Sequence, residues 1–344
     1  MAAKKSCGIE ELKKQIKDGN LDKLYLFYGE EDYLKEYYIE KIKEAVPHNG
    51  FPEFNHLIFN GKLPFSEYDD AWESFPMMSD RQLIIIKDCE IVKAGKGEVS
   101  TEEKKAFWSE KLNRLSDDTV VVFNEVSADK RSVLYKEISK KGTVIEFSYL
   151  SDTDLISWVI RESLNKKKKI SKENATYLVS RVDMGLSNLM NELNKLFDFC
   201  NEEILRSDID RVVSKSLNVI TFDLTEAIMK GDTKRAVSVL NDIKNNTNDS
   251  SFAILYLMLS TFEKILHAKL LSGKSNQEIA SEISVAPFFV KKYIDCAKAF
   301  ETETLVKIVN RVSEIDFDIK EGRINEWTAL YEYVTECLYY QRRG

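Results

Sequence analysis

Proline and glycine are scarce in this sequence. Its 344 residues include only 5 prolines and 13 glycines. Chains with many turns rely on these two residues, so the composition argues against an all-β or loop-rich fold and favours a helix-rich one. Because 344 residues are more than a single hydrophobic core usually serves, we expect two or three domains.

Residues that bind metals or form disulfides are few and scattered. None of the 5 cysteines belongs to a CxxC pair, and the 3 histidines do not cluster with them. A bound metal is therefore not expected. Free thiols at scattered positions fit a reducing cytoplasm. The cysteines are Cys7, Cys89, Cys200, Cys296 and Cys337, and the histidines are His48, His56 and His267.

Long apolar runs are also missing. Residues 1–10 contain no apolar segment of the kind that a secretory signal peptide requires. The longest apolar stretch, residues 252–259, is too short to cross a bilayer. We therefore expect a cytoplasmic protein without a membrane partner.

Basic residues do not outnumber acidic ones. The formal net charge is −7, whereas a protein that binds DNA by itself more often carries a positive surplus. Any contact with nucleic acid is therefore expected to be local or shared with other subunits. A run of four lysines at residues 166–169 is interpreted as a solvated loop, with a phosphate contact in an assembly as the alternative.

The first 148 residues alternate short apolar runs with helical patterns. Residues 24–28 form a compact apolar run that ends at Gly29, and a helix is expected from about Tyr33 to Val46. Strands that alternate with helices indicate an open, mostly parallel sheet covered on both faces. We therefore expect an α/β domain. Further strands are expected at residues 55–59, 83–86, 119–125 and 143–147, and further helices at residues 9–17, 102–115 and 132–140.

The turn at Gly29 has the position of a phosphate-binding loop but not its residues. In the pattern GxxxxGK[ST], Leu34 replaces the second glycine and Glu36 replaces the hydroxyl residue, although Lys35 is present. Residues 30–32 add three negative charges where a triphosphate would bind, and like charges repel. We therefore interpret Gly29 and Lys35 as parts of a degenerate nucleotide site and expect no bound cofactor.

The end of the strand at residues 119–125 gives a second indication. An ATPase would carry aspartate and then glutamate there, to bind the metal and to activate water, whereas this chain has Asn124 and Glu125. The amide is an uncharged and weaker ligand. We interpret Glu125 as a solvated strand end, with a catalytic acid as the alternative, and expect no catalytic residue in this chain.

After residue 148 the sequence predicts only helices. Residues 149–213 are expected to form a small helical unit behind the α/β domain. Residues 214–344 are expected to form a separate helical domain. Because residues 252–271 are apolar nearly all round at their start, they are predicted to form its central buried helix.

Residues 275–299 resemble a helix-turn-helix. The second helix would carry Lys291, Lys292 and Lys298, but no arginine, asparagine or glutamine. Base readout relies on arginine and amide side chains. We therefore favour helical packing for this segment and keep DNA reading as the alternative.

The stretch FPMMSDRQ at residues 75–82 precedes the apolar run at residues 83–86. Its two methionines, Met77 and Met78, have two interpretations. Periodicity alone favours a place in the local core, because large apolar side chains are mostly buried. Alternatively, they project from the surface as adaptable apolar groups that fit a partner's pocket.

Five segments, in their order and spacing, resemble the delta subunits of bacterial DNA polymerase III, the clamp-opening subunits of the clamp loader. Each segment alone is moderately specific, and together they extend over nearly the whole chain. They are LYLFYGEEDYLKE (residues 24–36), FPMMSDRQLIIIKD (75–88), NVITFDLTEAIMKGDTKRAVSVL (218–240), SNQEIASEISVAPFFVKKYI (275–294) and DFDIKEGRINEWTALYEYV (316–334).

The resemblance implies three domains in an AAA+-like arrangement. They are a RecA-like α/β domain at residues 1–148, an all-helical lid at 149–213 and an all-helical collar at 214–344. It also implies a subunit of the DNA polymerase (nucleotidyltransferase) holoenzyme that does not hydrolyse ATP itself, in agreement with the degenerate site. The collar would join it to the gamma/tau and delta-prime subunits, and primed DNA would be bound within that complex at the nucleoid.

The resemblance also assigns roles to named residues. The first domain of this family pushes two apolar side chains into a pocket of the ring-shaped beta sliding clamp and opens one interface of the ring. Those positions commonly carry leucine and phenylalanine, and they match Met77 and Met78 here, with Phe75 nearby. Methionine keeps the apolar character and gives up aromatic area.

We therefore expect a clamp-binding site at Phe75, Met77 and Met78. Two other functions are the alternatives. One is an ATP-independent DNA-binding regulator that uses residues 275–299, and the other is an active AAA+ ATPase.

Overall fold

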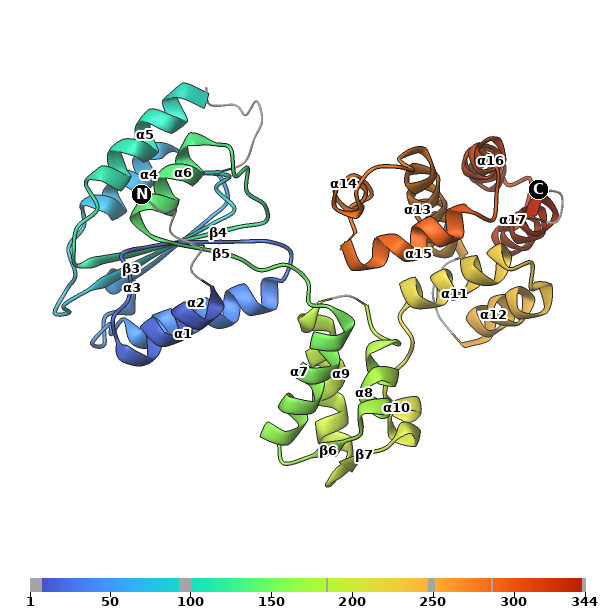
Figure 1. The fold of residues 1–344 in the computed structure, drawn as a ribbon, viewed down its shortest axis with the longest axis horizontal. Coiled ribbons are helices and arrows are strands. Elements are labelled where there is room, and N and C mark those ends of the chain that lie inside the picture. Colours follow the sequence, from blue (N-terminus) through green and yellow to red (C-terminus); the bar gives the residue numbers. More distant parts are fainter. Residues whose placement is uncertain (1–7, 93–100, 184, 247–250, 286, 342–344) are drawn as a thin grey trace. The chain divides into compact units, whose positions relative to one another are not determined.

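The computed structural model describes residues 8–92, 101–183, 185–246, 251–285 and 287–341 (Figure 1). The chain divides into two compact units. The first contains residues 1–150 and 185–187, and the second contains residues 151–184 and 188–344. The expected lid and collar both fall within the second unit apart from residues 149–150 and 185–187, and their separation into two domains stays a prediction.

A five-stranded parallel sheet forms the centre of the first unit. The strands are β1 (Leu24–Tyr28), β2 (His56–Asn60), β3 (Gln82–Lys87), β4 (Thr119–Glu125) and β5 (Thr143–Glu146). Their order is β2-β3-β4-β1-β5, and every neighbouring pair is parallel. The three inner strands are buried along nearly their whole length, as expected for continuous apolar runs in a parallel sheet. The structure thus confirms the expected α/β fold class.

Helices cover both faces of this sheet (Figure 1). They are α1 (Ile9–Asp18), α2 (Asp32–Ala45), α3 (Pro52–Asn55), α4 (Phe65–Glu73), α5 (Thr101–Asn113) and α6 (Val133–Lys141). Successive strand residues point to opposite faces. Leu26 and Ile84 therefore join one hydrophobic core with α4, α5 and α6, whereas Phe27 and Ile85 join a second core with α1 and α2.

From residue 151 onward the structure is almost entirely helical. The helices that follow β5 are α7 (Asp152–Asn165), α8 (Lys172–Val179), α9 (Leu186–Phe199), α10 (Arg206–Val212), α11 (Leu217–Met229), α12 (Thr233–Asn246), α13 (Ser251–Leu270), α14 (Asn276–Glu282), α15 (Pro287–Ala297), α16 (Thr302–Lys320) and α17 (Glu326–Gln341). Two short strands, β6 (Lys169–Ile170) and β7 (Glu203–Ile204), also pair in parallel. The sequence did not predict them, because two residues are too few to show a period.

Helix α13 lies at the centre of the core of the second unit. It packs against α11, α15, α16 and α17, and its side chains Leu255, Met258 and Phe262 are buried in that core. The expected central helix at residues 252–271 is therefore confirmed. In the described part of the chain, no helix has both the length and the apolar character needed to cross a membrane.

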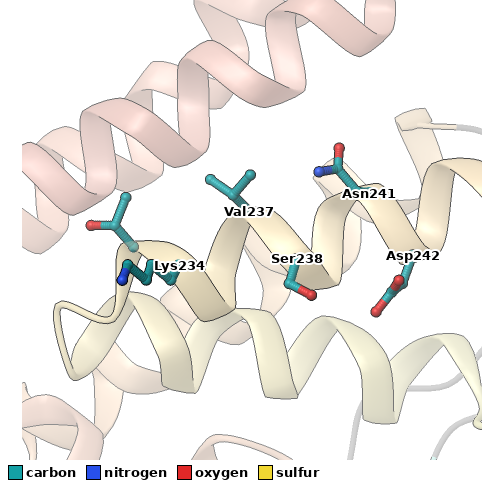
Figure 2. A pocket seen from close by; sticks show the side chains of 6 residues that line it. Lys234, Val237, Ser238, Asn241 and Asp242 are labelled. Atoms are coloured by element: carbon teal, nitrogen blue, oxygen red, sulfur yellow. The ribbon is translucent and has the colours of Figure 1, made fainter.

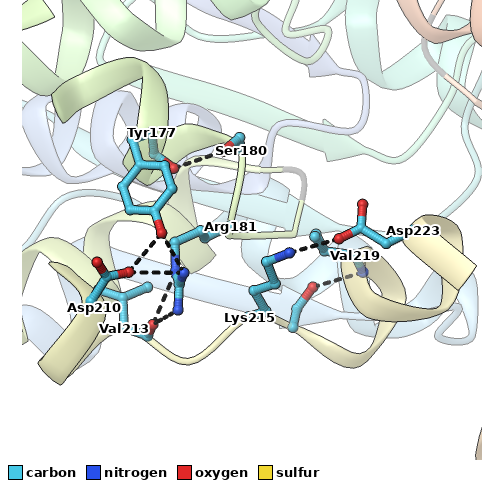
Figure 3. Close-up of polar contacts among 9 residues, drawn as sticks. Tyr177, Ser180, Arg181, Asp210, Val213, Lys215, Val219 and Asp223 are labelled. Atoms are coloured by element: carbon cyan, nitrogen blue, oxygen red, sulfur yellow. Dashed lines mark hydrogen bonds and ion pairs between the residues drawn. The ribbon is translucent and has the colours of Figure 1, made fainter. Parts of the chain in front are cut away.

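Polar contacts fix the connection between α10 and α11 (Figure 3). The guanidinium group of Arg181 donates to the carbonyl of Val213, with N···O distances of 2.8 and 3.2 Å, and to the hydroxyl of Tyr177 at 2.8 Å. It also forms an ion pair with Asp210 at 3.2 Å. Directed contacts from this one side chain to three partners hold the connection in a single geometry.

Candidate functional site

Three apolar side chains are exposed together on the loop between α4 and β3. The exposed fraction is 81 % for Phe75, 41 % for Met77 and 78 % for Met78. Neither methionine belongs to the two cores of the first unit, so the core interpretation of this pair is wrong. Neighbouring large apolar groups that remain exposed commonly mark an interaction surface. We call residues 74–81 the exposed loop.

Polar contacts fix the two ends of the exposed loop. The fully buried side chain of Gln82 donates to the carbonyl of Ser74 at 2.8 Å and to the hydroxyl of Thr119 at 3.0 Å. It also accepts a hydrogen bond from the Ser74 hydroxyl at 3.0 Å. Further along, the hydroxyl of Ser79 donates to the carbonyl of Pro47 at 2.7 Å. The loop therefore has defined anchor points at its start and near its end.

Strand β3 gives the exposed loop a rigid base. Leu83, Ile84, Ile85 and Ile86 are fully buried between β2 and β4. Gln82 is the first residue of β3, so the loop lies at the amino end of the strand. Nucleotide sites of parallel sheets lie at the carboxyl ends of the strands. The exposed loop and the degenerate nucleotide site are therefore at opposite ends of β3.

Gly29 serves the fold rather than a phosphate. Its φ is +121°, and a Cβ atom at this position would lie 2.3 Å from the carbonyl oxygen of Phe147. Its own N–H donates to the carbonyl of Val126 at 3.2 Å. Only glycine permits so close an approach of two backbone segments. The glycine that resembled a phosphate-binding turn is therefore explained by backbone packing.

The charged residues that follow Gly29 have partners within the chain. The Nζ atom of buried Lys35 lies 2.8 Å from the Asp32 carboxylate and donates to the carbonyl of Glu125 at 3.1 Å. Glu36, which replaces the metal-binding hydroxyl, lies 2.7 Å from Lys87 and accepts a hydrogen bond from Asn124 at 3.1 Å. The groups that would have to bind phosphate and metal are thus already bonded to other groups of the chain.

Glu31 fills part of the same region. Its side chain is buried, and its carboxylate accepts the N–H of Leu186, with N···O distances of 3.1 and 3.2 Å. Burial raises the pKa of Glu31, although the hydrogen bonds from the Leu186 and Tyr33 backbone partly offset this effect. A carboxylate that is already bonded here would repel a polyphosphate.

Glu125 lies in a different environment from the one we expected. It is buried rather than solvated, so the interpretation as a solvated strand end is wrong. Its carboxylate accepts the Cys89 thiol at 3.2 Å and the N–H groups of Glu90 and Ile91, each at 3.1 Å. Burial raises the pKa of Glu125, while these three hydrogen bonds lower it. The side chain thus holds the turn after β3 in place.

Some of the lysines in the second unit that were considered for contact with nucleic acid form contacts within the chain. In the lysine run, Lys168 donates to the carbonyl of Asn201 at 2.9 Å, whereas the other three lysines are exposed. In α15, the Nζ atom of Lys292 lies 3.5 Å from the centre of the Phe222 ring. Lys298 forms an ion pair with Asp295 at 2.6 Å. These contacts weaken the case for α15 as a DNA-reading helix.

A shallow depression on α12 is another candidate surface (Figure 2). Thr233 and Val237 line it and also line an adjoining groove, where they are joined by Tyr331 and Tyr339 of α17. Val237 and Tyr339 are exposed apolar side chains. The sequence did not single out this surface, because it depends on the packing of two helices far apart in the chain.

No group of three histidine, cysteine, aspartate or glutamate side chains that could hold a metal ion occurs within the described ranges. The polar residues that fix the exposed loop, above all Gln82, were not predicted from the sequence. Gln82 belongs to a strand pattern, and its partner Ser74 lies eight residues away across an irregular segment. A local pattern does not reveal such a pair.

Two models of known protein families together match most of the chain. The family model described as DNA polymerase III, delta subunit, matches residues 25–148. The model described as DNA polymerase III delta subunit, C-terminal domain, matches residues 218–337.

Individual relatives agree with the family models. The chain is 26 % identical to DNA polymerase III subunit delta of Bacillus subtilis, over 94 % of this chain and 95 % of that protein. It is 20 % identical to the probable DNA polymerase III subunit delta of Aquifex aeolicus, over 86 % of this chain and 85 % of that one. Among solved structures, the Bacillus subtilis DNA clamp loader delta protein matches with a TM-score of 0.76 and 25 % identity, over 96 % of this chain and 99 % of that one.

Proposed function

The chain belongs to the DNA polymerase III delta subunit family, and we propose that it binds the ring-shaped sliding clamp and opens it for loading onto primed DNA. In this proposal Phe75, Met77 and Met78 enter an apolar pocket of the clamp. The observation that carries the proposal is the exposure of these three side chains on one short loop.

The chemistry of the exposed loop suits this role. An apolar anchor that fills a pocket can dominate the affinity of a much larger interface. Methionine is flexible and polarisable, so a pair of them adapts to a pocket that commonly receives leucine and phenylalanine. Phe75 adds an aromatic ring with 81 % of its surface exposed, which offsets the aromatic area that the methionines lack.

Ring opening then depends on binding energy alone. The clamp has closed and open states, and a ligand shifts their balance only by its differential affinity for them. The rigid base formed by β3 allows binding at the exposed loop to act on the ring instead of bending the loop. ATP bound to other subunits would control when the loop is presented.

We propose that this chain neither binds nor hydrolyses ATP and has no catalytic site of its own. The engagement of Lys35 with Asp32 and of Glu36 with Lys87 supports this part of the proposal. Chemistry would then take place on other subunits of the polymerase holoenzyme, in the bacterial cytoplasm.

Further partners are proposed for the second unit. Residues 149–213 would form the lid and residues 214–344 the collar, through which the chain joins the gamma/tau and delta-prime subunits. The match of the C-terminal family model to residues 218–337 supports a shared structure there. The groove between α12 and α17, with exposed Val237 and Tyr339, is a surface available for such a contact.

Capture of the full chain on immobilised clamp tests the proposal. The double variant Met77→Ala/Met78→Ala should lose most of its binding, because it removes two exposed anchor side chains while leaving both cores intact. Val133→Ala serves as the matched control, since Val133 is 52 % exposed on α6 in the same unit and lies outside the exposed loop. Binding of the double variant at the wild-type level would exclude the assignment.

A further inference from the structure

One buried side chain fixes the backbone of the exposed loop at its centre. Asn55, the last residue of α3, is fully buried. Its Oδ1 accepts the N–H of Met77 at 2.7 Å, and its Nδ2 donates to the carbonyl of the same residue at 2.9 Å. Nδ2 also donates to the carbonyl of His48 at 3.0 Å. Both backbone polar groups of Met77 therefore bond to a single amide.

A second asparagine holds the next residue. Met78 has a φ of 52°, in the left-handed region that residues other than glycine rarely adopt. The Nδ2 atom of Asn49 donates to the Met78 carbonyl at 2.7 Å. Because the local sequence does not favour this conformation, contacts from outside the exposed loop must maintain it.

We propose that Asn55, assisted by Asn49, is a positioning residue for clamp binding. The two asparagines hold the Met77–Met78 backbone in the conformation that keeps the Met78 side chain exposed before the clamp arrives. A loop that is already ordered loses less conformational entropy on binding, and the affinity rises accordingly. This inference rests on the proposed clamp binding through Phe75, Met77 and Met78.

The connection is not a feature of the local sequence. Asn55 and Met77 are 22 residues apart, and the two segments meet only because α3 and the exposed loop precede the paired strands β2 and β3. An apolar side chain at position 55 would leave both polar groups of Met77 without this partner. These groups are partly buried, and leaving partly buried polar groups unpaired is unfavourable, so the loop would rearrange to let them bond to water.

Two measurements on the full chain test the positioning role. In Asn55→Ala, amide hydrogen exchange at Met77 and Met78 should become faster in the free protein. The dissociation constant for immobilised clamp should rise about tenfold, the change expected when two net hydrogen bonds no longer order the loop. Asn124→Ala is the matched control, because it removes another buried amide of the same unit that bonds to Glu36 and not to the exposed loop.

A double-mutant cycle separates positioning from general stability. When Met77→Ala/Met78→Ala is already present, adding Asn55→Ala should change the dissociation constant by less than about twofold, because the side chains that the loop positions are gone. A purely structural role would give the same fold-change in both backgrounds.

The results distinguish a failure of the positioning role from a failure of the clamp-binding assignment. Wild-type exchange at Met77 in Asn55→Ala, or equal fold-changes in the two backgrounds, would refute the positioning role while the clamp-binding assignment stands. If the methionine double variant itself binds at the wild-type level, the clamp-binding assignment fails and the positioning role fails with it.

Discussion

Alanine substitutions of the two methionines in the exposed loop should affect clamp affinity and folding stability to different degrees. The perturbations are the single variants Met77→Ala and Met78→Ala. In the free chain 78 % of Met78 is exposed but only 41 % of Met77. Surface that is exposed before binding can be buried by the clamp, whereas surface that is already buried stabilises the fold. The two variants should therefore rank in opposite order in the two properties.

The size of each effect follows from these exposed fractions. Complete burial of a methionine side chain is worth about 2 kcal/mol. By proportion, burial of the exposed part in a clamp pocket contributes about 1.6 kcal/mol for Met78 and about 0.8 kcal/mol for Met77. These values correspond to about 15-fold and about fourfold weaker binding of the alanine variants. The parts already buried contribute about 0.4 kcal/mol to folding for Met78 and about 1.2 kcal/mol for Met77.

Two assays measure the two rankings. Binding of each full-length variant to immobilised clamp gives the dissociation constant, and unfolding in urea gives the free energy of unfolding. Val133→Ala should leave the dissociation constant unchanged. A larger loss of affinity in Met77→Ala than in Met78→Ala would refute the reasoning, and so would a single common order in both assays.

Two further predictions concern the degenerate nucleotide site. Addition of millimolar MgATP should leave the thermal unfolding midpoint of the full chain unchanged, because the internal ion pairs block the site. A ligand that did bind, present at 100 times its dissociation constant, would add about 2.7 kcal/mol of stability. An upward shift of the midpoint would therefore show that the ion pairs do not block the site. Glu31→Gln should change the pH dependence of stability. Burial raises the pKa of Glu31 in the folded state, so wild type binds more protons when folded and should lose stability relative to the variant as the pH rises from the ordinary glutamate pKa of 4.5 through the raised value. Urea unfolding of both proteins between pH 4 and 7 checks this, and parallel pH profiles would contradict it.

Much of the architecture followed from local pattern. The apolar run at residues 120–123 predicted a buried strand, because four successive residues facing both sides of a parallel sheet must all be apolar. The long apolar segment at residues 252–271 predicted the central helix of the second unit for a similar reason. These features could be predicted because an element that is buried on all sides needs an apolar residue at nearly every position.

The candidate site was predicted less completely. The sequence marked Met77 and Met78, but side-chain hydrophobicity does not distinguish a core residue from an exposed anchor. Exposure depends on what surrounds a residue, and it was the anchored conformation of the exposed loop that placed these side chains outside both cores. Glu125 shows the converse case. This charged residue at a strand end is buried, and three hydrogen-bond donors from the neighbouring turn satisfy its carboxylate.

The sequence by itself determined the strand and helix succession, the loss of the phosphate-binding pattern at Gly29 to Glu36, and the family resemblance. These properties depend on residues close together in the chain or on residue order. The tertiary structure decided how that loss is accommodated, through the pairing of Lys35 with Asp32 and of Glu36 with Lys87. It also decided how Asn55 holds Met77, because that contact exists only once β2 and β3 have paired and brought two distant segments together.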